Sequence, residues 1–166
     1  MTSGEIAMCQ TVFKNAIDYQ QVRIYQGQFI KGSGHNALTP FGHPHFPVIQ
    51  SACGQALGYL DDFSHCRDHV TAEWFIHEMG HVWQYQLGYP VFRQGLWMAL
   101  SCGYFVRPGH AEPHAYRLPL EHPLPTQRFS QWNMEQQCEL IAHYFGSVHW
   151  MQPSHLSSHL PFYQAA

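Results

Sequence analysis

The fold is decided by the stretch FIHEMGHVWQ, which runs from Phe75 to Gln84. It contains the pattern His-Glu-x-x-His, formed by His77, Glu78 and His81. On a helix, histidines four residues apart lie on one face, one turn above each other. Zinc binds neutral imidazole nitrogens at about 2.0–2.1 Å and keeps an open position for water in catalytic sites. The pattern therefore predicts a zinc site with His77 and His81 as ligands and Glu78 as the general base.

The residues around this motif predict a largely buried helix from about Ala72 to Leu87. Thr71 is suited to cap its N-terminus, and Gly88 with Pro90 would end it. The apolar side chains of this helix include Trp74, Phe75, Ile76, Val82 and Trp83. An alternative interpretation is a buried helix whose two histidines are satisfied by hydrogen bonds, with the motif glutamate at a solvent edge. Placing three polar groups in so apolar a helix is costly unless something pairs them, which favours a metal.

The composition predicts one folded domain spanning residues 1–166. Hydrophobic residues make up 45% of the chain, which excludes general disorder, while charged residues are only 11%. So few charges suggest that part of the surface faces a partner. The net charge of −3, with only 8 basic residues and no basic cluster, gives no basis for nucleic-acid binding.

Apolar runs, the first residues and the cysteines bear on whether the chain crosses a membrane, is exported by a signal peptide or forms disulfides. No apolar run approaches the roughly 20 residues needed to span a bilayer, and the first residues lack a basic stretch followed by an apolar one. We therefore expect no membrane span and no signal peptide. The five cysteines have no C-x-x-C pair, so we expect free thiols that lie mostly in the core; they are Cys9, Cys53, Cys66, Cys102 and Cys138.

Shorter patterns outside the motif predict an α+β fold. Thr2 and Glu5 form a capping box ahead of a helix from about Ser3 to Asn15. Alternating residues predict a strand near 22–25, and the segment 46–49 predicts short strands with irregular edges. These strands would form a small, irregular β-sheet.

A second major helix is predicted from about Met134 to Val148, capped by Asn133. It carries Glu135 and Glu139 one turn apart on one face. No histidine follows the motif closely enough for a metzincin site, so a glutamate is expected to be the third ligand. We assign Glu135 as the ligand and Glu139 as the acceptor of a ligand histidine's second N–H. The swapped assignment remains open, as does a solvated acidic face.

A zinc hydrolase also needs a donor that stabilises the oxyanion of the tetrahedral intermediate. Tyr116 lies in a long proline-rich loop, residues 108–125, and His143 lies two turns beyond Glu135. Long ordered loops are often functional. Both residues are candidate donors, and a purely structural role remains open for each.

Four segments together resemble the Vgr-related zincin-like metallopeptidase domains of bacteria, which occur alone or fused to type VI secretion spike proteins. The segments are GEIAMCQTVFKNAIDYQQVRIYQG, ALTPFGHPHF, FIHEMGHVWQYQLG and NMEQQCELIAHYF. The resemblance extends to about Phe145 and implies a gluzincin-like site in which Glu135 joins His77 and His81. It also implies an effector made in the bacterial cytoplasm, secreted by a type VI system and active in the target-cell periplasm. The chain has His143 where an aspartate is usual in the family.

The function predicted from the sequence is that of a zinc metallopeptidase in which Glu78 deprotonates a zinc-activated water for attack on a peptide bond. Its partners would be a peptide, protein or peptidoglycan substrate, an immunity protein and a secretion spike protein. One alternative is a peptidoglycan endopeptidase or amidase with the same zinc site. Another is a non-catalytic zinc module that docks on a secretion spike, and a histidine-rich metal-storage protein is a more distant one.

Overall fold

The structure is a computed structural model, and it describes residues 1–32, 35–50, 56–106, 109, 112–118, 128–150 and 160–162. Of the proline-rich loop at 108–125, only residues 109 and 112–118 are described, and Cys53 also lies outside the described residues. Among the described cysteines, all four are free thiols, as predicted. Cys9 and Cys138 are buried, whereas Cys66 is half-buried and Cys102 is exposed, so the core prediction holds for two of them.

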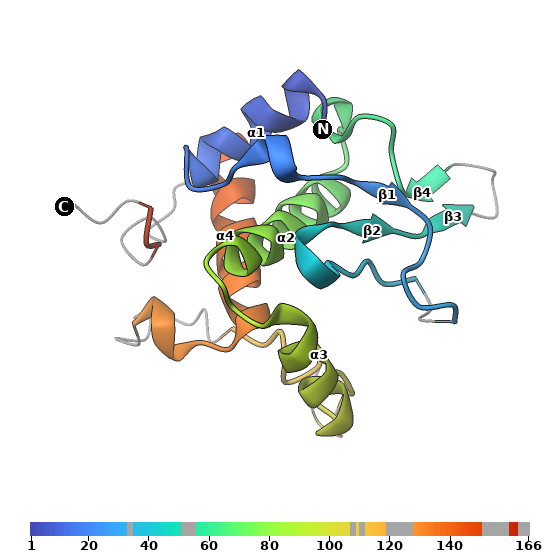
Figure 1. Cartoon of the computed structure of the whole chain (residues 1–166), viewed down its shortest axis with the longest axis vertical. Helices are drawn as coiled ribbons and strands as arrows, with labels where there is room; N and C mark the ends of the chain where they lie inside the picture. Colours follow the sequence, from blue (N-terminus) through green and yellow to red (C-terminus); the bar gives the residue numbers. More distant parts are fainter. Residues whose placement is uncertain are drawn as a thin grey trace.

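Helices dominate the fold, and the strands are short (Figure 1). The helices are α1 (Ser3–Phe13), α2 (His69–Gln86), α3 (Val91–Leu100) and α4 (Met134–His149). The strands are β1 (Tyr25–Gln26), β2 (His45–Phe46), β3 (Val48–Gln50) and β4 (Ala56–Gly58). β1 pairs with β2 in parallel, and β3 pairs with β4 antiparallel, which gives two small two-stranded sheets. In the described part of the chain, these elements are connected by 3-10 turns at η1 (Tyr19–Gln21), η2 (Pro40–Gly42), η3 (Phe63–His65) and η4 (Phe129–Gln131). The expected α+β class, with a small irregular β component, is confirmed.

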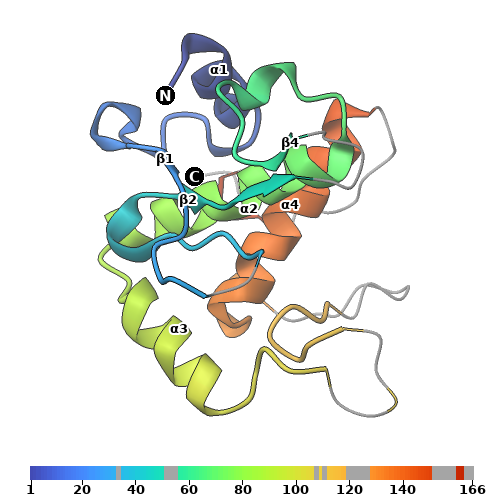
Figure 2. The same ribbon diagram turned by 90° about the vertical axis from the view of Figure 1, so that its right-hand side faces the viewer.

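The centre of the molecule is the contact between α2 and α4, which cross in both views (Figures 1 and 2). α1 lies toward one end of this pair and α3 toward the other. The helices approach closely because α2 has a glycine at the contact. A Cβ added to Gly80 would lie 2.7 Å from the Cys138 sulfur of α4, well inside contact distance. The glycine of the His-Glu-x-x-His motif thus brings the two predicted ligand-bearing helices together.

Aromatic and aliphatic side chains from both helices and the preceding loops fill the core. Phe63 stacks on Phe75 of α2 with ring centroids 4.5 Å apart, and Phe46 of β2 packs against both. The fully buried residues of the core include Val12, Phe13, Ile76, Met79, Ile141 and Phe145. The part of α2 that carries the motif is therefore packed into the core.

The starts of the helices show which of the predicted N-caps are present in the structure. The Thr2 and Glu5 capping box is present in α1, and Asn133 caps α4, as predicted. The predicted cap of α2 was wrong: the Asp68 carboxylate accepts the Thr71 N–H at 2.8 Å, so the helix begins three residues earlier. A carboxylate at the helix N-terminus also interacts favourably with the helix dipole.

The N-terminal segment departs from two predicted boundaries. α1 ends at Phe13 rather than Asn15, because Lys14 adopts a left-handed backbone with φ of 52°. The strand expected near 22–25 is found at Tyr25–Gln26, because only these two residues pair with β2; the preceding 3-10 turn, capped by the Asp18 carboxylate, ends at Gln21. The local alternation was real, but partner strand β2 pairs only with its last part.

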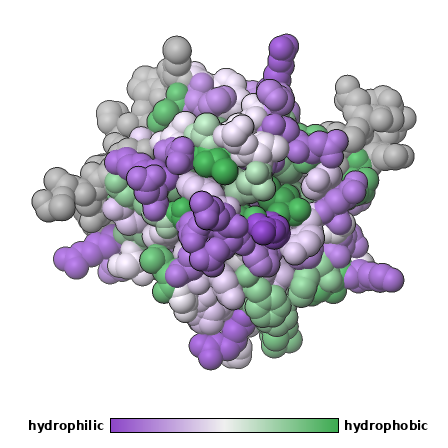
Figure 3. All heavy atoms as spheres, turned by 45° about the horizontal axis from the view of Figure 1, so that its top comes forward, coloured by the Kyte–Doolittle hydropathy of each residue, from purple (hydrophilic) through white to green (hydrophobic). Residues whose placement is uncertain are grey.

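The surface mixes hydrophilic and hydrophobic residues. The face drawn in Figure 3 carries scattered hydrophobic side chains among hydrophilic ones. α3 is more apolar, since its exposed side chains include Phe92, Leu96, Trp97 and Leu100. Over the described part of the chain, no helix combines the length and apolar character needed to cross a membrane.

Candidate metal centre

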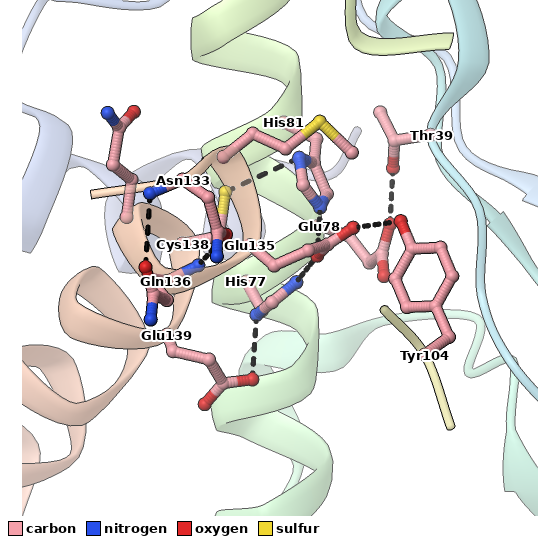
Figure 4. Close-up of polar contacts among 12 residues, drawn as sticks. Thr39, His77, Glu78, His81, Tyr104, Asn133, Glu135, Gln136, Cys138 and Glu139 are labelled. Atoms are coloured by element: carbon pink, nitrogen blue, oxygen red, sulfur yellow. Dashed lines mark hydrogen bonds and ion pairs between the residues drawn. The ribbon is translucent and has the colours of Figure 1, made fainter. Parts of the chain in front are cut away.

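The two motif histidines of α2 converge on one carboxylate oxygen from α4 (Figure 4). The Nε2 atoms of His77 and His81 each lie 3.0 Å from Oε2 of Glu135. All three side chains are buried, with 4–6% of each residue exposed. The structure therefore brings together the three residues that the sequence predicted as metal ligands.

The spacing of these atoms fits a zinc ion. Two atoms bound to one tetrahedral zinc at about 2.0–2.1 Å lie ~3.3 Å apart. The two nitrogen–oxygen separations of 3.0 Å are close to that value. The donor set, two imidazoles and one carboxylate, is also one that catalytic zinc sites use. The residues present therefore fit the metal that the sequence predicts.

The other nitrogen of each histidine faces an acceptor. Oε1 of Glu139 lies 3.0 Å from Nδ1 of His77, and Oε1 of Gln84 lies 2.9 Å from Nδ1 of His81. The His77–Glu139 contact lacks hydrogen-bond geometry and is an ion pair when His77 is protonated. Gln84 is itself fixed, because its amide donates to the Met134 carbonyl at 3.0 Å. Acceptors of this kind orient metal-binding histidines and leave Nε2 for the metal.

Cys138 is a second candidate for the third ligand. His77, His81 and Cys138 offer ligand atoms that all lie within 4.8 Å of one another, close enough to hold a metal ion. However, the sulfur lies 3.4 Å from Nδ1 of His81, on the side of the ring that faces Gln84. The Nε2 atoms of both histidines point instead toward Glu135. The geometry therefore favours the carboxylate, and the cysteine fits the core position expected for it.

The motif glutamate is held by a residue that the sequence did not indicate. Oε2 of Glu78 accepts a hydrogen bond of 2.5 Å from the Thr39 hydroxyl, and both residues are buried. Thr39 precedes η2 and is separated from Glu78 by 39 positions. A buried carboxylate with one oxygen fixed in this way has a defined orientation beside the two histidines.

Two tyrosines lie at the same site. The Tyr104 hydroxyl donates to Oε1 of Glu135 at 2.6 Å, a contact that sequence patterns did not predict. The ring of Tyr116, a predicted candidate, lies 6.0 Å from the His77 ring and 5.7 Å from that of Tyr104. Burial raises the pKa of both tyrosines, and the nearby carboxylate of Glu135 raises it further. Both hydroxyls therefore stay protonated and able to donate.

His143, the other predicted donor, lies behind Glu139. Its Nε2 is 3.7 Å from Glu139 and its Nδ1 is 3.7 Å from Glu73. Its side chain is 44% exposed. His143 thus neighbours the metal-binding residues through Glu139, whereas Tyr116 lies against His77 itself.

Without a metal ion, the two histidines and Glu135 shift one another's pKa values strongly. Burial by itself would lower the pKa of His77, but its contacts with Glu135 and Glu139 raise it to about 10. Burial likewise opposes the charge of His81, and its neighbours Cys138 and Glu135 raise its pKa well above the usual range. Burial would raise the pKa of Glu135, yet the two histidines hold it far below its ordinary value. The metal-free cluster therefore holds protons that a metal ion would have to displace.

A cleft of about 490 Å³ opens beside the motif helix. Its walls include residues of α2 and α4. Among the lining residues are Glu73, Trp74, His77, Glu78, Tyr116 and Glu139. The glutamate predicted as general base therefore faces a space that a substrate can enter.

Comparison with known proteins identifies one relative. No family model matches the chain. Over 146 residues, 87% of its length, the chain is 30% identical to the type VI secretion system spike protein VgrG2b of Pseudomonas aeruginosa, and it spans 13% of that protein. The structure resembles the solved effector domain of Pseudomonas aeruginosa VgrG2b with a TM-score of 0.70 and 26% identity, covering 95% of this chain and 79% of that one. The chain is homologous to this effector domain.

Proposed function

We propose, from its homology with the VgrG2b effector domain and the geometry of its buried cluster, that the chain is a zinc metallopeptidase acting as a type VI secretion effector. The observation that carries the enzymatic part is the convergence of His77, His81 and Glu135, with the buried Glu78 carboxylate beside them. Burying ionisable groups is costly unless they are paired, and one metal ion would pair all three of these ligands.

The zinc ion would be held by His77, His81 and Glu135, while Glu139 and Gln84 orient the imidazoles. When bound, zinc supplies a Lewis acid and lowers the pKa of a coordinated water to about 7. The Tyr104 hydroxyl donates to the other oxygen of Glu135 and fixes that carboxylate in place.

The Glu78 carboxylate would act as general base and then as general acid. It accepts the proton of the attacking water and afterwards delivers it to the leaving amine. The Thr39 hydroxyl holds one carboxylate oxygen and leaves the other for the proton. Tyr116 lines the cleft beside Glu78 and stays protonated, so it is the better placed of the two predicted donors to stabilise an oxyanion.

The decisive experiment compares Glu78→Gln with the wild type and with Glu112→Gln, which changes an exposed glutamate in the same way. Metal analysis of purified protein should find one zinc per chain in all three. Hydrolysis of a fluorogenic peptide library should fall at least about 100-fold in Glu78→Gln alone. Full activity of a zinc-loaded Glu78→Gln protein, or a folded wild type that takes up no zinc, would contradict the proposal.

The effector role rests on homology and has its own test. The chain is expected to inhibit growth when it is exported to the bacterial periplasm and not when it stays in the cytoplasm, and Glu78→Gln should be harmless in both compartments. Incubation with isolated sacculi distinguishes the substrates, because release of cell-wall peptides would indicate a peptidoglycan endopeptidase. Equal toxicity of the wild type and Glu78→Gln would instead favour a non-catalytic module.

A further inference from the structure

The cleft beside Glu78 has two kinds of wall. One part is apolar and includes Ile49, Val70, Trp74 and Ala142. The other carries two carboxylates in addition to that of Glu78, those of Glu73 and Glu139. A space that combines an apolar surface with charged groups suits an amphipathic ligand better than a purely apolar one.

The two carboxylates come from the two helices that form the metal-binding cluster, and both line the cleft. Glu73 lies on α2 one turn before His77, and Glu139 lies on α4 one turn after Glu135. His143 stands between them, 3.7 Å from each, and remains 44% exposed. The carboxylates thus face a common space at the metal-binding helices, and Glu139 already contacts His77.

Among the side chains of the described cleft wall, none carries a permanent positive charge. Its described wall contains three carboxylates, two imidazoles and no lysine or arginine. Burial raises the pKa of Glu73, although the neighbouring His143 and His69 partly oppose the rise. A carboxylate that has lost part of its hydration is stabilised by an incoming positive charge.

Lysine and arginine side chains suit both the apolar and the acidic part of the cleft wall. Their methylene stems can cover apolar surface while the charged head reaches a carboxylate. The indole of Trp74 adds an aromatic face, a surface that attracts cations. An acidic side chain in the same place would meet three like charges.

We infer that this cleft is the subsite for a lysine or arginine side chain next to the scissile bond, and that Glu73 selects its positive charge. The inference rests on the proposed peptidase function, because it assigns the specificity of that same site. Glu73 is preferred over Glu139 as the selecting group, because Glu139 is engaged with the ligand His77. The substrate class is therefore a basic segment of polypeptide rather than an acidic or purely apolar one.

The activity test uses quenched fluorescent peptides that differ only at the residues flanking the cleaved bond, with arginine, lysine, glutamine or glutamate there. The wild type should cleave the basic peptides with a kcat/KM at least roughly tenfold above that for glutamine, the size of one charge-assisted contact. Glu73→Gln, which keeps the side-chain shape, should bring the ratio of kcat/KM between the basic and the glutamine peptides close to one. Glu112→Gln is the matched control, and Glu73→Lys should favour the glutamate peptide.

A binding measurement tests the cleft without catalysis. Zinc-loaded Glu78→Gln protein is titrated with acetyl-arginine amide and followed by NMR, and Glu73→Gln added to it should weaken binding roughly tenfold. Equal cleavage of basic, neutral and acidic peptides, or binding of acetyl-arginine amide that is unchanged by Glu73→Gln, would overturn the inference. Absence of hydrolysis of every peptide by zinc-loaded wild type would overturn the peptidase proposal instead, and the binding result would still decide whether the cleft takes a cation.

Discussion

Replacing Gly80 by alanine tests whether the close approach of α2 and α4 assembles the metal centre. An added Cβ would lie 2.7 Å from the Cys138 sulfur, 3.2 Å from its Cβ and 3.4 Å from its Cα. The backbone of α4 cannot move away without carrying Glu135, which lies one turn before Cys138. The substitution should therefore displace Glu135 from the histidines as well as strain the core.

The expected loss of stability is the difference of two effects. Overpacking of a well-packed core costs about 1–3 kcal/mol. Alanine in place of glycine inside a helix returns about 1 kcal/mol. The free energy of unfolding of metal-free Gly80→Ala should thus fall by roughly 1 kcal/mol, and its zinc affinity should fall as well.

Urea unfolding of the chelator-treated protein measures stability, and competition with a zinc indicator measures affinity. Gly95→Ala is the matched control, because it lies inside α3 and its Cβ would meet the flexible end of Met134 at 3.4 Å and the Tyr104 hydroxyl at 3.6 Å, both ordinary contact distances. It should raise stability by up to about 1 kcal/mol. Adding Cys138→Ala to Gly80→Ala should restore part of the loss, so strictly additive effects of the two changes would refute the steric explanation. A Gly80→Ala protein as stable as Gly95→Ala, with unchanged zinc affinity, would refute the close approach itself.

Three further predictions concern the cap, the base and the protons of the cluster. Asp68→Ala should lower the free energy of unfolding by about 1 kcal/mol, measured in urea, because it removes the cap of α2. Thr39→Val should lower kcat roughly tenfold or more with zinc content unchanged, whereas Thr39→Ser should retain most activity; equal rates for the two variants would argue against the hydroxyl. The pKa of His77 in the folded metal-free protein is about 10 against an ordinary 6.5, so the folded state binds the proton more tightly than the unfolded state. That stabilisation is complete below about pH 6.5 and is lost as the pH rises toward 10, so the Tm of metal-free protein should drop between pH 7 and pH 9.5, and a Tm that rises over this range would contradict the assignment.

The parts of the fold that the sequence predicted are those set by local chemistry. The cap of α1 by Thr2 and that of α4 by Asn133 depend on residues within one turn, so a short pattern was sufficient. The proximity of Glu139 to His77 followed from a similar argument, since carboxylates one turn apart can serve one histidine pair. At the start of α2 the sequence analysis chose Thr71, whereas Asp68, three residues earlier, is the cap, in line with the stronger preference for aspartate at this position.

The contacts that the sequence did not predict come from segments without a periodic pattern. Thr39 reaches Glu78 from an irregular turn, and Tyr104 reaches Glu135 from the turn that follows α3. Each depends on where the loop lies after folding, across 39 and 31 positions respectively. Residue type alone could not indicate which tyrosine contacts Glu135, because the chain contains 9 tyrosines.

The turn next to Thr39 is held by aromatic contacts of Phe41. Phe41 has a left-handed backbone with φ of 55°, a conformation that costs a residue other than glycine about 1–3 kcal/mol. Its ring stacks on Phe92 of α3 at 5.3 Å and meets Phe29 edge-on at 6.2 Å, which offsets that cost. α3 therefore does more than expose an apolar surface. Through the contact of Phe92 with Phe41 it supports the backbone next to Thr39, and the Thr39 hydroxyl orients the carboxylate of the proposed general base.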